Sequence, residues 1–144
     1  MKPIEIFDSQ EQLDKCVKWW QEKLFLSDWI IKARVCVPED FLCENRMGEN
    51  DFDMVNKCCV IRILDQEHYG DRIMKYCAEK VLVHELLHCK YNWVYNADSY
   101  EGKYVDTIEH GLLEQTAKSL IMAKYDLTLD YFKSQTGGKT DENN

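Results

Sequence analysis

Apolar residues recur with two different periods along this chain. Between residues 10 and 25 they recur every three or four positions, which predicts an amphipathic helix. Ser9 and Gln12 have the spacing of a capping box at the start of that helix. The predicted buried stripe consists of Leu13, Cys16, Val17, Trp20 and Leu24.

Two segments have the pattern of β-strands. Residues 29–37 alternate between positions expected to face the core and positions expected to face solvent, and Pro38 ends the run. Residues 57–64 are almost continuously apolar. Residues 39–53 are expected to form a loop or an irregular excursion, with room for one more short strand within 39–56, and residues 65–71 form a turn. The core-facing positions of the first strand are Ile31, Ala33, Val35 and Val37.

The helical period returns at about Arg72 and predicts a long helix to about Tyr91. A polar and aromatic connection follows over residues 92–104. Asp106 and Glu109 form a second capping-box pattern, which predicts a helix over 107–125 and a short helical piece over 126–133. The order of elements predicts a single α+β domain over residues 1–133, followed by a disordered tail over 134–144.

The second predicted helix contains the motif His84-Glu85-Leu86-Leu87-His88. Residues four apart lie on one face of a helix, so both imidazoles can reach one metal ion. Zinc suits two such nitrogens, a third protein ligand and an open position for water, and Glu85 would take a proton from that water. The alternative is that both histidines are core residues, which would then need other hydrogen-bond partners.

The next predicted helix offers three candidates for the third ligand, Glu109, His110 and Glu114. His110 lies within the buried arc of that helix and the two glutamates lie at its edges. A carboxylate that faces the core is costly unless it is paired or bound to a metal. Glu109 also has a structural explanation as the capping partner of Asp106. The buried arc is formed by Leu113, Ala117, Leu120 and Ile121.

The motif of residues 84–88, followed by a helix that reads Glu-Gln-Thr-Ala-Lys-Ser-Leu over residues 114–120, resembles the minimal gluzincin metallopeptidases. These include the minigluzincins and the small peptidase domains of the ImmA/IrrE type found in bacteria and phages. The resemblance covers about residues 10–125 and implies a zincin-like fold in which a helix, a small twisted sheet, the active-site helix and a glutamate helix follow one another.

This resemblance also implies the roles of individual residues. His84, His88 and Glu114 would bind one Zn²⁺, and Glu85 would be the general base. Lys118 stands where the larger gluzincins often have an acid that orients the first histidine, so that role has no obvious owner.

The function expected from these residues is zinc-dependent hydrolysis of a peptide or protein substrate bound along a strand edge. One alternative is a zincin-fold module that binds or regulates a protein with little turnover. Another is a deformylase-type hydrolase with Cys58 or Cys59 as the third ligand. Residues that could stabilise the oxyanion are His68, Tyr91, Tyr95, Tyr100 and Tyr104.

Composition narrows the range of partners and compartments. The formal charge of −8 argues against a broad basic surface for nucleic acid and against docking on anionic lipid. No apolar run reaches the roughly 20 residues of a membrane helix, and the residues after Met1 lack the apolar core of a secretion signal. Seven cysteines, an odd number without a Cys-x-x-Cys pair, are typical of reduced thiols in the cytoplasm.

The negative charge is concentrated in one segment. Residues 39–53 contain six acidic residues and one arginine, a net charge of −5. If this segment borders the active-site cleft, it would favour basic peptides; otherwise it is a solvated loop.

Overall fold

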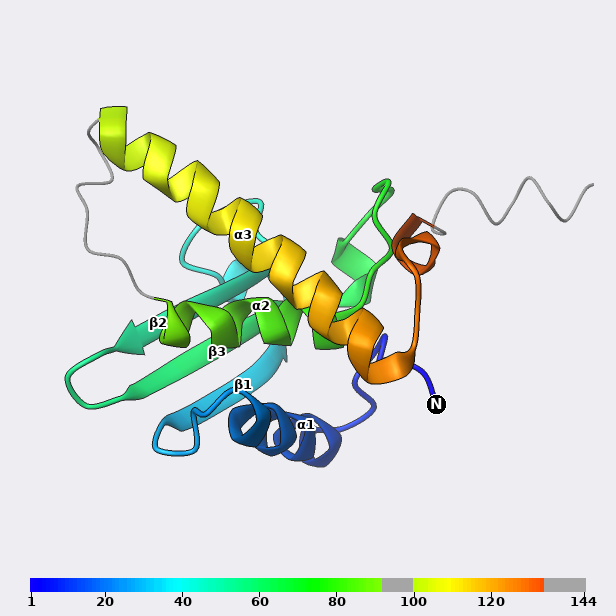
Figure 1. Ribbon diagram of the computed structural model, residues 1–144, viewed down its shortest axis with the longest axis horizontal. Coiled ribbons are helices and arrows are strands. Elements are labelled where there is room, and N and C mark those ends of the chain that lie inside the picture. The colour runs from blue at the N-terminus through cyan, green and yellow to red at the C-terminus, as the bar shows by residue number, and fades with distance from the viewer. Residues whose placement is uncertain (92–99, 134–144) are drawn as a thin grey trace, which may run out of the picture.

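The computed structural model describes residues 1–91 and 100–133 (Figure 1). Over these residues the chain forms a small α+β fold of three helices and a three-stranded sheet, as the order of elements predicts. Short 3₁₀ turns link several of these elements. The elements are α1 (Gln10–Lys23), β1 (Ile30–Cys36), β2 (Gly48–Asp53), β3 (Cys58–Leu64), α2 (Ala78–Lys90) and α3 (Tyr100–Tyr125).

The sheet has the order β1-β3-β2, with β1 parallel and β2 antiparallel to the central strand β3. Ala33 of β1 and Asn50 of β2 both pair with Ile61, so all three lie on one face of the sheet. β2 occupies the acidic segment in which one short strand had room to form. It lacks a continuous apolar stripe, and its pairing with β3 is what makes it a strand.

Helix α2 lies between the sheet and α3 (Figure 1). Ten of its 13 residues are buried, because the sheet and α1 cover one side and α3 covers the other. Its apolar side chains pack against the strand residues that face the helices, including Ile61 and Ile63, which are fully buried. The candidate metal-binding motif is therefore carried by the most enclosed helix of the fold.

The predicted start of this helix at about residue 72 is wrong. Helix α2 begins at Ala78, and the backbone around its start bonds to the N-terminal segment and to the 3₁₀ turn Leu129–Lys133. The N–H groups of Ala78 and Glu79 donate to the carbonyls of Glu5 and Ile4, and the N–H of Lys75 donates to the carbonyl of Phe132. The spacing of apolar residues within one segment cannot predict hydrogen bonds between residues so far apart in the chain.

The last predicted helix is also wrong at its start. Helix α3 begins at Tyr100 rather than at residue 107, so Asp106 and Glu109 lie inside it and do not form an N-terminal capping box. The 3₁₀ turn Leu129–Lys133 confirms the short helical piece after it. The expected tail at 134–144 and part of the expected connection, residues 92–99, lie outside the described residues.

The first helix and the two apolar strands are confirmed within one or two residues. At the start of α1, Ser9 Oγ accepts from the N–H of Gln12, but Gln12 Oε1 accepts from the N–H of Asp8 rather than from that of Ser9. In β1, Val35 was expected to be buried, yet it is 41% exposed. Val35 pairs with Ile63 and lies on the same face as Ala33, but β1 is at the edge of the described sheet, where a side chain has a neighbouring strand on one side only.

A buried carboxylate, Glu79, joins the helices to one another. Its Oε1 accepts from Trp20 Nε1 of α1 at 2.9 Å and from Lys124 Nζ of α3 at 2.7 Å. Its Oε2 accepts from Tyr125 Oη at 2.7 Å and from the N–H of Ile4 at 2.9 Å. Burial raises the pKa of Glu79, but Lys124 and the other donors outweigh burial and hold it below its usual value.

All seven cysteines are free thiols, and five of them are buried among apolar residues. Free cysteine at such positions acts as a small apolar side chain. No helix within residues 1–91 and 100–133 has the length and apolar character that crossing a bilayer requires.

Gly48 allows β2 to approach α2 closely. A Cβ atom at this position would lie 2.6 Å from Val81 Cγ1 and 3.1 Å from Glu85 Cγ. We expect Gly48→Ala to lower the free energy of unfolding by about 1–3 kcal/mol, because the strand or the helix must shift. Chemical denaturation of the variant measures this loss.

Gly111→Ala is the matched control for that substitution. A Cβ at Gly111, inside α3, meets no atom within 4 Å. Alanine should there stabilise the helix by about 0.5–1 kcal/mol. Equal effects of the two substitutions would contradict the close approach at Gly48.

Candidate metal centre

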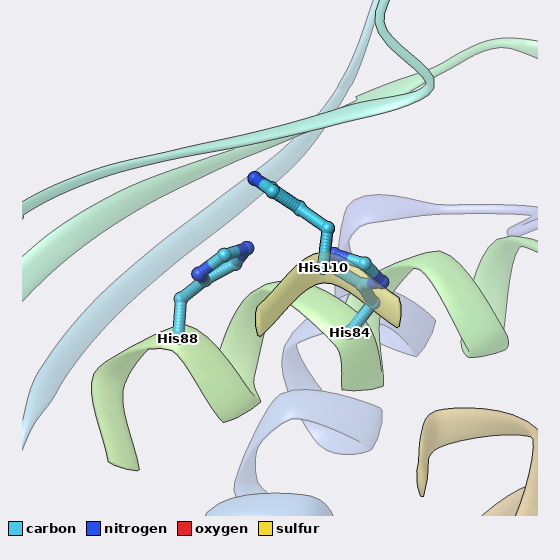
Figure 2. Close-up of side chains that lie close together, drawn as sticks. All are labelled: His84, His88 and His110. Atoms are coloured by element: carbon cyan, nitrogen blue, oxygen red, sulfur yellow. The ribbon is translucent and has the colours of Figure 1, made fainter. Parts of the chain in front are cut away.

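Three imidazole rings meet between α2 and α3. His84 and His88 lie one helical turn apart on α2, and His110 comes from α3 (Figure 2). One nitrogen from each ring lies within 4.8 Å of the others. Zinc held by three imidazoles at about 2.1 Å keeps the nitrogens about 3.4 Å apart, so the cluster would contract slightly around an ion.

Glu114 lies beside His84 and is held by two partners. Its Oε2 is 2.7 Å from His84 Nδ1, and its Oε1 accepts from Lys80 Nζ at 2.7 Å. Burial raises the pKa of Glu114, but the hydrogen bond to His84 and the charge of Lys80 lower it to about 2, so it is a carboxylate at neutral pH. With Nδ1 of His84 donating to this carboxylate, Nε2 is the nitrogen left to bind a metal.

His88 is held in the neutral form that metal binding requires. Burial, with the neighbouring His84 and His110, lowers the pKa of His88 to about 3. Oε1 of the buried Glu109 lies 3.7 Å from His88 Nδ1. The structure therefore places Glu109 beside His88 and Glu114 beside His84. His110 joins the imidazole cluster, but it is exposed and Glu109 is buried, so the expected burial of these two residues is wrong.

Glu85 is buried, and its Oε2 has no hydrogen-bond partner within residues 1–91 and 100–133. Burial raises the pKa of this carboxyl to about 7, against the lowering effect of the charges of His84 and Arg46. Asn50 Nδ2 of β2 donates to the backbone carbonyl of Glu85 at 2.7 Å and so ties the motif to the sheet. A carboxyl with one free oxygen and a pKa near neutrality suits proton transfer.

A cavity of about 500 Å³ opens onto these groups. Its walls are α2, α3 and the segment that runs from residue 45 into β2. Gly48, Asn50 and Phe52, which lie on the helix-facing side of β2, line it together with Glu85 and the three histidines. The motif therefore faces a space that is large enough for part of a peptide.

The other candidates from the sequence that the structure describes do not line this cavity. His68 sits in an exposed 3₁₀ turn with its Nδ1 2.6 Å from Asp65, and neither Tyr91 nor Tyr104 lines the cavity. Tyr95 and the side chain of Tyr100 lie outside the described residues. Cys59 contacts Cys89, with the sulfurs 3.7 Å apart, and neither Cys58 nor Cys59 joins the described histidine cluster.

None of the six acids of residues 39–53 lines the cavity. Glu49 is buried on the other face of β2, where it accepts from the N–H groups of Leu42 and Cys43 and pairs with Arg62. Asp53 caps the turn that follows β2. The single arginine of this segment, Arg46, does line the cavity.

Sequence reasoning did not identify Lys80, Asn50 or Arg46. Lys80 stands four residues before His84, a spacing that places it on the same helix face and could have drawn attention to it. Arg46 is the one cation in an acidic segment, which is a weak signal. Nothing in the sequence pairs Asn50 with Glu85, because their contact depends on how β2 packs against α2.

The residues present suit zinc by the chemistry of their donor set. Three imidazoles meet here, each with a carboxylate nearby, and a buried oxygen of Glu85 has no hydrogen-bond partner within residues 1–91 and 100–133. Imidazole nitrogens with carboxylates beside them are typical of zinc ligands. Comparison of the chain with models of protein families, with curated proteins and with solved structures finds no match.

Proposed function

We propose that this protein is a zinc-dependent metallopeptidase with a zincin-like fold, which holds one Zn²⁺ through His84, His88 and His110. The observation that carries the proposal is the meeting of three imidazoles from two helices in a cavity that Glu85 also lines, with its Oε2 unpartnered in the described part of the chain. Three nitrogen ligands leave a fourth position open, which is the arrangement of catalytic rather than structural zinc sites.

Glu114 and Glu109 act on the ligand histidines in this proposal. Glu114 accepts a hydrogen bond from His84 Nδ1–H and so leaves Nε2 as the metal-binding nitrogen, while Lys80 holds Glu114 in place. Glu109 stands in the corresponding position beside His88. Glu114, the third ligand expected from the family resemblance, thus takes the orienting role for which the sequence offered no owner.

Bound zinc would supply a Lewis acid and lower the pKa of water at the site to about 7. Glu85 would take the proton of the attacking water on its free Oε2 and pass it to the leaving amine of the peptide. The hydrogen bond from Asn50 to the carbonyl of Glu85 keeps the base at a fixed distance from β2.

The substrate would bind along β2. This strand is at the edge of the sheet in the described part of the chain, and its helix-facing residues line the cavity. An extended peptide that pairs with the outer edge of β2 gains main-chain hydrogen bonds, and its scissile bond would lie beside the histidines.

Zinc content and peptide cleavage test this function together. Wild-type protein supplied with zinc should retain about one ion per chain, measured by elemental mass spectrometry after removal of excess metal. It should also cleave members of a mixed peptide library, with products identified by mass spectrometry. Absence of bound zinc would contradict the proposal, and zinc binding without cleavage would favour the module that binds peptides with little turnover.

Two substitutions decide between the candidates for the third ligand. His110→Ala should reduce zinc affinity about as severely as His88→Ala, which serves as the reference. Glu114→Gln removes an orienting group and should reduce zinc affinity by only about 10- to 100-fold. Competition with a chelator of known affinity measures both changes. The reverse order of effects would show that Glu114 binds the metal and that His110 does not.

A further inference from the structure

The two cationic side chains that line the cavity differ in whether they have an acidic partner. Two permanent cations line it in the described structure, Arg46 and Lys80. Lys80 is buried and donates to Glu114 at 2.7 Å, so its charge is neutralised within the protein. Arg46 is exposed, and no carboxylate of residues 1–91 and 100–133 lies within ion-pair distance of it.

The acidic groups of the same cavity are already engaged. Asp106 lies 3.4 Å from His110, and Glu114 is shared between Lys80 and His84. Glu85 is the buried base. Arg46 therefore lines the cavity without an ion pair to any acidic group among residues 1–91 and 100–133.

Arg46 lines the same cavity as Glu85 and the three histidines. It precedes β2 by two residues, beside Met47 and Gly48, which also line the cavity. Asn45 before it has φ of 60°, a left-handed conformation that asparagine tolerates better than most residues, and this turns the chain into the strand. A peptide bound along β2 would pass Arg46 at the start of the strand.

A guanidinium group binds a carboxylate through two parallel hydrogen bonds, in a geometry that lysine does not reproduce. We propose that Arg46 recognises a carboxylate of the substrate near the scissile bond, so that this site prefers acidic peptides over neutral or basic ones. This inference rests on the proposed peptidase function for its substrate class. It also reverses the expectation that the acidic segment selects basic peptides, because that segment contributes its arginine to the cavity and none of its acids.

The carboxylate can be the C-terminus of a peptide or an acidic side chain, and matched peptides separate the two sources. One pair of octapeptides differs only in a free or amidated C-terminus, and a second pair differs only in Glu or Gln at one position. Binding of each peptide to zinc-loaded Glu85→Gln protein is measured by fluorescence polarisation. The value of kcat/KM for each peptide is measured with protein that retains Glu85.

We expect the wild-type protein to bind the carboxylate member of one pair more tightly than its neutral counterpart. Arg46→Gln should weaken the binding of that carboxylate peptide by about 10- to 100-fold. Neutral peptides should change by less than about threefold, and Arg46→Lys should restore only part of the loss. Arg34→Gln, which removes an exposed arginine of β1 that does not line this cavity, is the matched control and should change neither pair.

A preference for acidic peptides that persists in Arg46→Gln would overturn the inference, as would equal binding of both members of both pairs by the wild type. Selective binding without cleavage would support the role of Arg46 and contradict the peptidase function. Cleavage without selectivity would support the peptidase function and contradict the role of Arg46.

Discussion

Replacing Glu85 with Gln is expected to lower the rate of peptide hydrolysis by about 10²- to 10⁴-fold while zinc content stays at the wild-type level. The amide has the shape of the carboxylate but cannot take a proton from water. Glu85 lines the cavity with a free oxygen, whereas the imidazoles that would bind the ion are those of His84, His88 and His110. Initial rates on a cleaved peptide, with zinc measured on the same samples, test both halves of the expectation.

Glu22→Gln is the control for this substitution, because it makes the same change of carboxylate to amide at an exposed position of α1 that does not line the cavity. It should leave the rate unchanged. A Glu85→Gln protein that retains both zinc and wild-type activity would show that another group carries the proton. Loss of zinc together with activity would instead point to collapse of the site.

Replacing Glu79 with Ala is expected to lower the free energy of unfolding by about 3–5 kcal/mol. The substitution leaves the ammonium group of Lys124 without its partner and removes the acceptor for Trp20, Tyr125 and the N–H of Ile4. These donors come from α1, α3 and the N-terminal segment, so the effect should be global. Denaturant unfolding followed by tryptophan fluorescence measures it, with both proteins in the same metal state.

The contribution of Glu79 should depend on pH in a defined direction. Its pKa in the folded protein is held below the ordinary value of 4.5 by Lys124 and the other donors, which outweigh burial. The folded state therefore binds this proton less readily than the unfolded state, and the stabilisation is present above about pH 4.5 and lost as the pH falls through the folded pKa. The difference in unfolding free energy between wild type and Glu79→Gln should shrink from pH 6 to pH 3.

A difference that stays constant or grows over that range would contradict the assignment of the low pKa to Glu79. Glu11→Gln is a suitable comparison, because Glu11 is exposed and pairs only with Lys15 one turn along α1. Exposed pairs of this kind contribute about 0.3–0.5 kcal/mol, so this variant should lie close to wild type at every pH.

The residue that completes the histidine pair of α2 is a feature for which the sequence leaves three alternatives open. Glu109, His110 and Glu114 occupy neighbouring positions of one helix, and the helical period alone leaves each within reach of the motif. The crossing of α3 over α2 brings His110 to the imidazoles and sets Glu114 against His84 Nδ1. The packing of Lys80 against Glu114 adds a constraint that depends on two residues 34 positions apart.

The sequence by itself determined the parts of this protein that depend on local periodicity. The first helix, the strands near residues 30–36 and 58–64, and the placement of His84, Glu85 and His88 on one helix follow from apolar spacing and the geometry of a helical turn. Only the tertiary structure decided the rest. The strand at residues 48–53, the start of α2 at Ala78 and the exposure of Arg46 to the cavity depend on pairings between distant segments, whose energies no local pattern encodes.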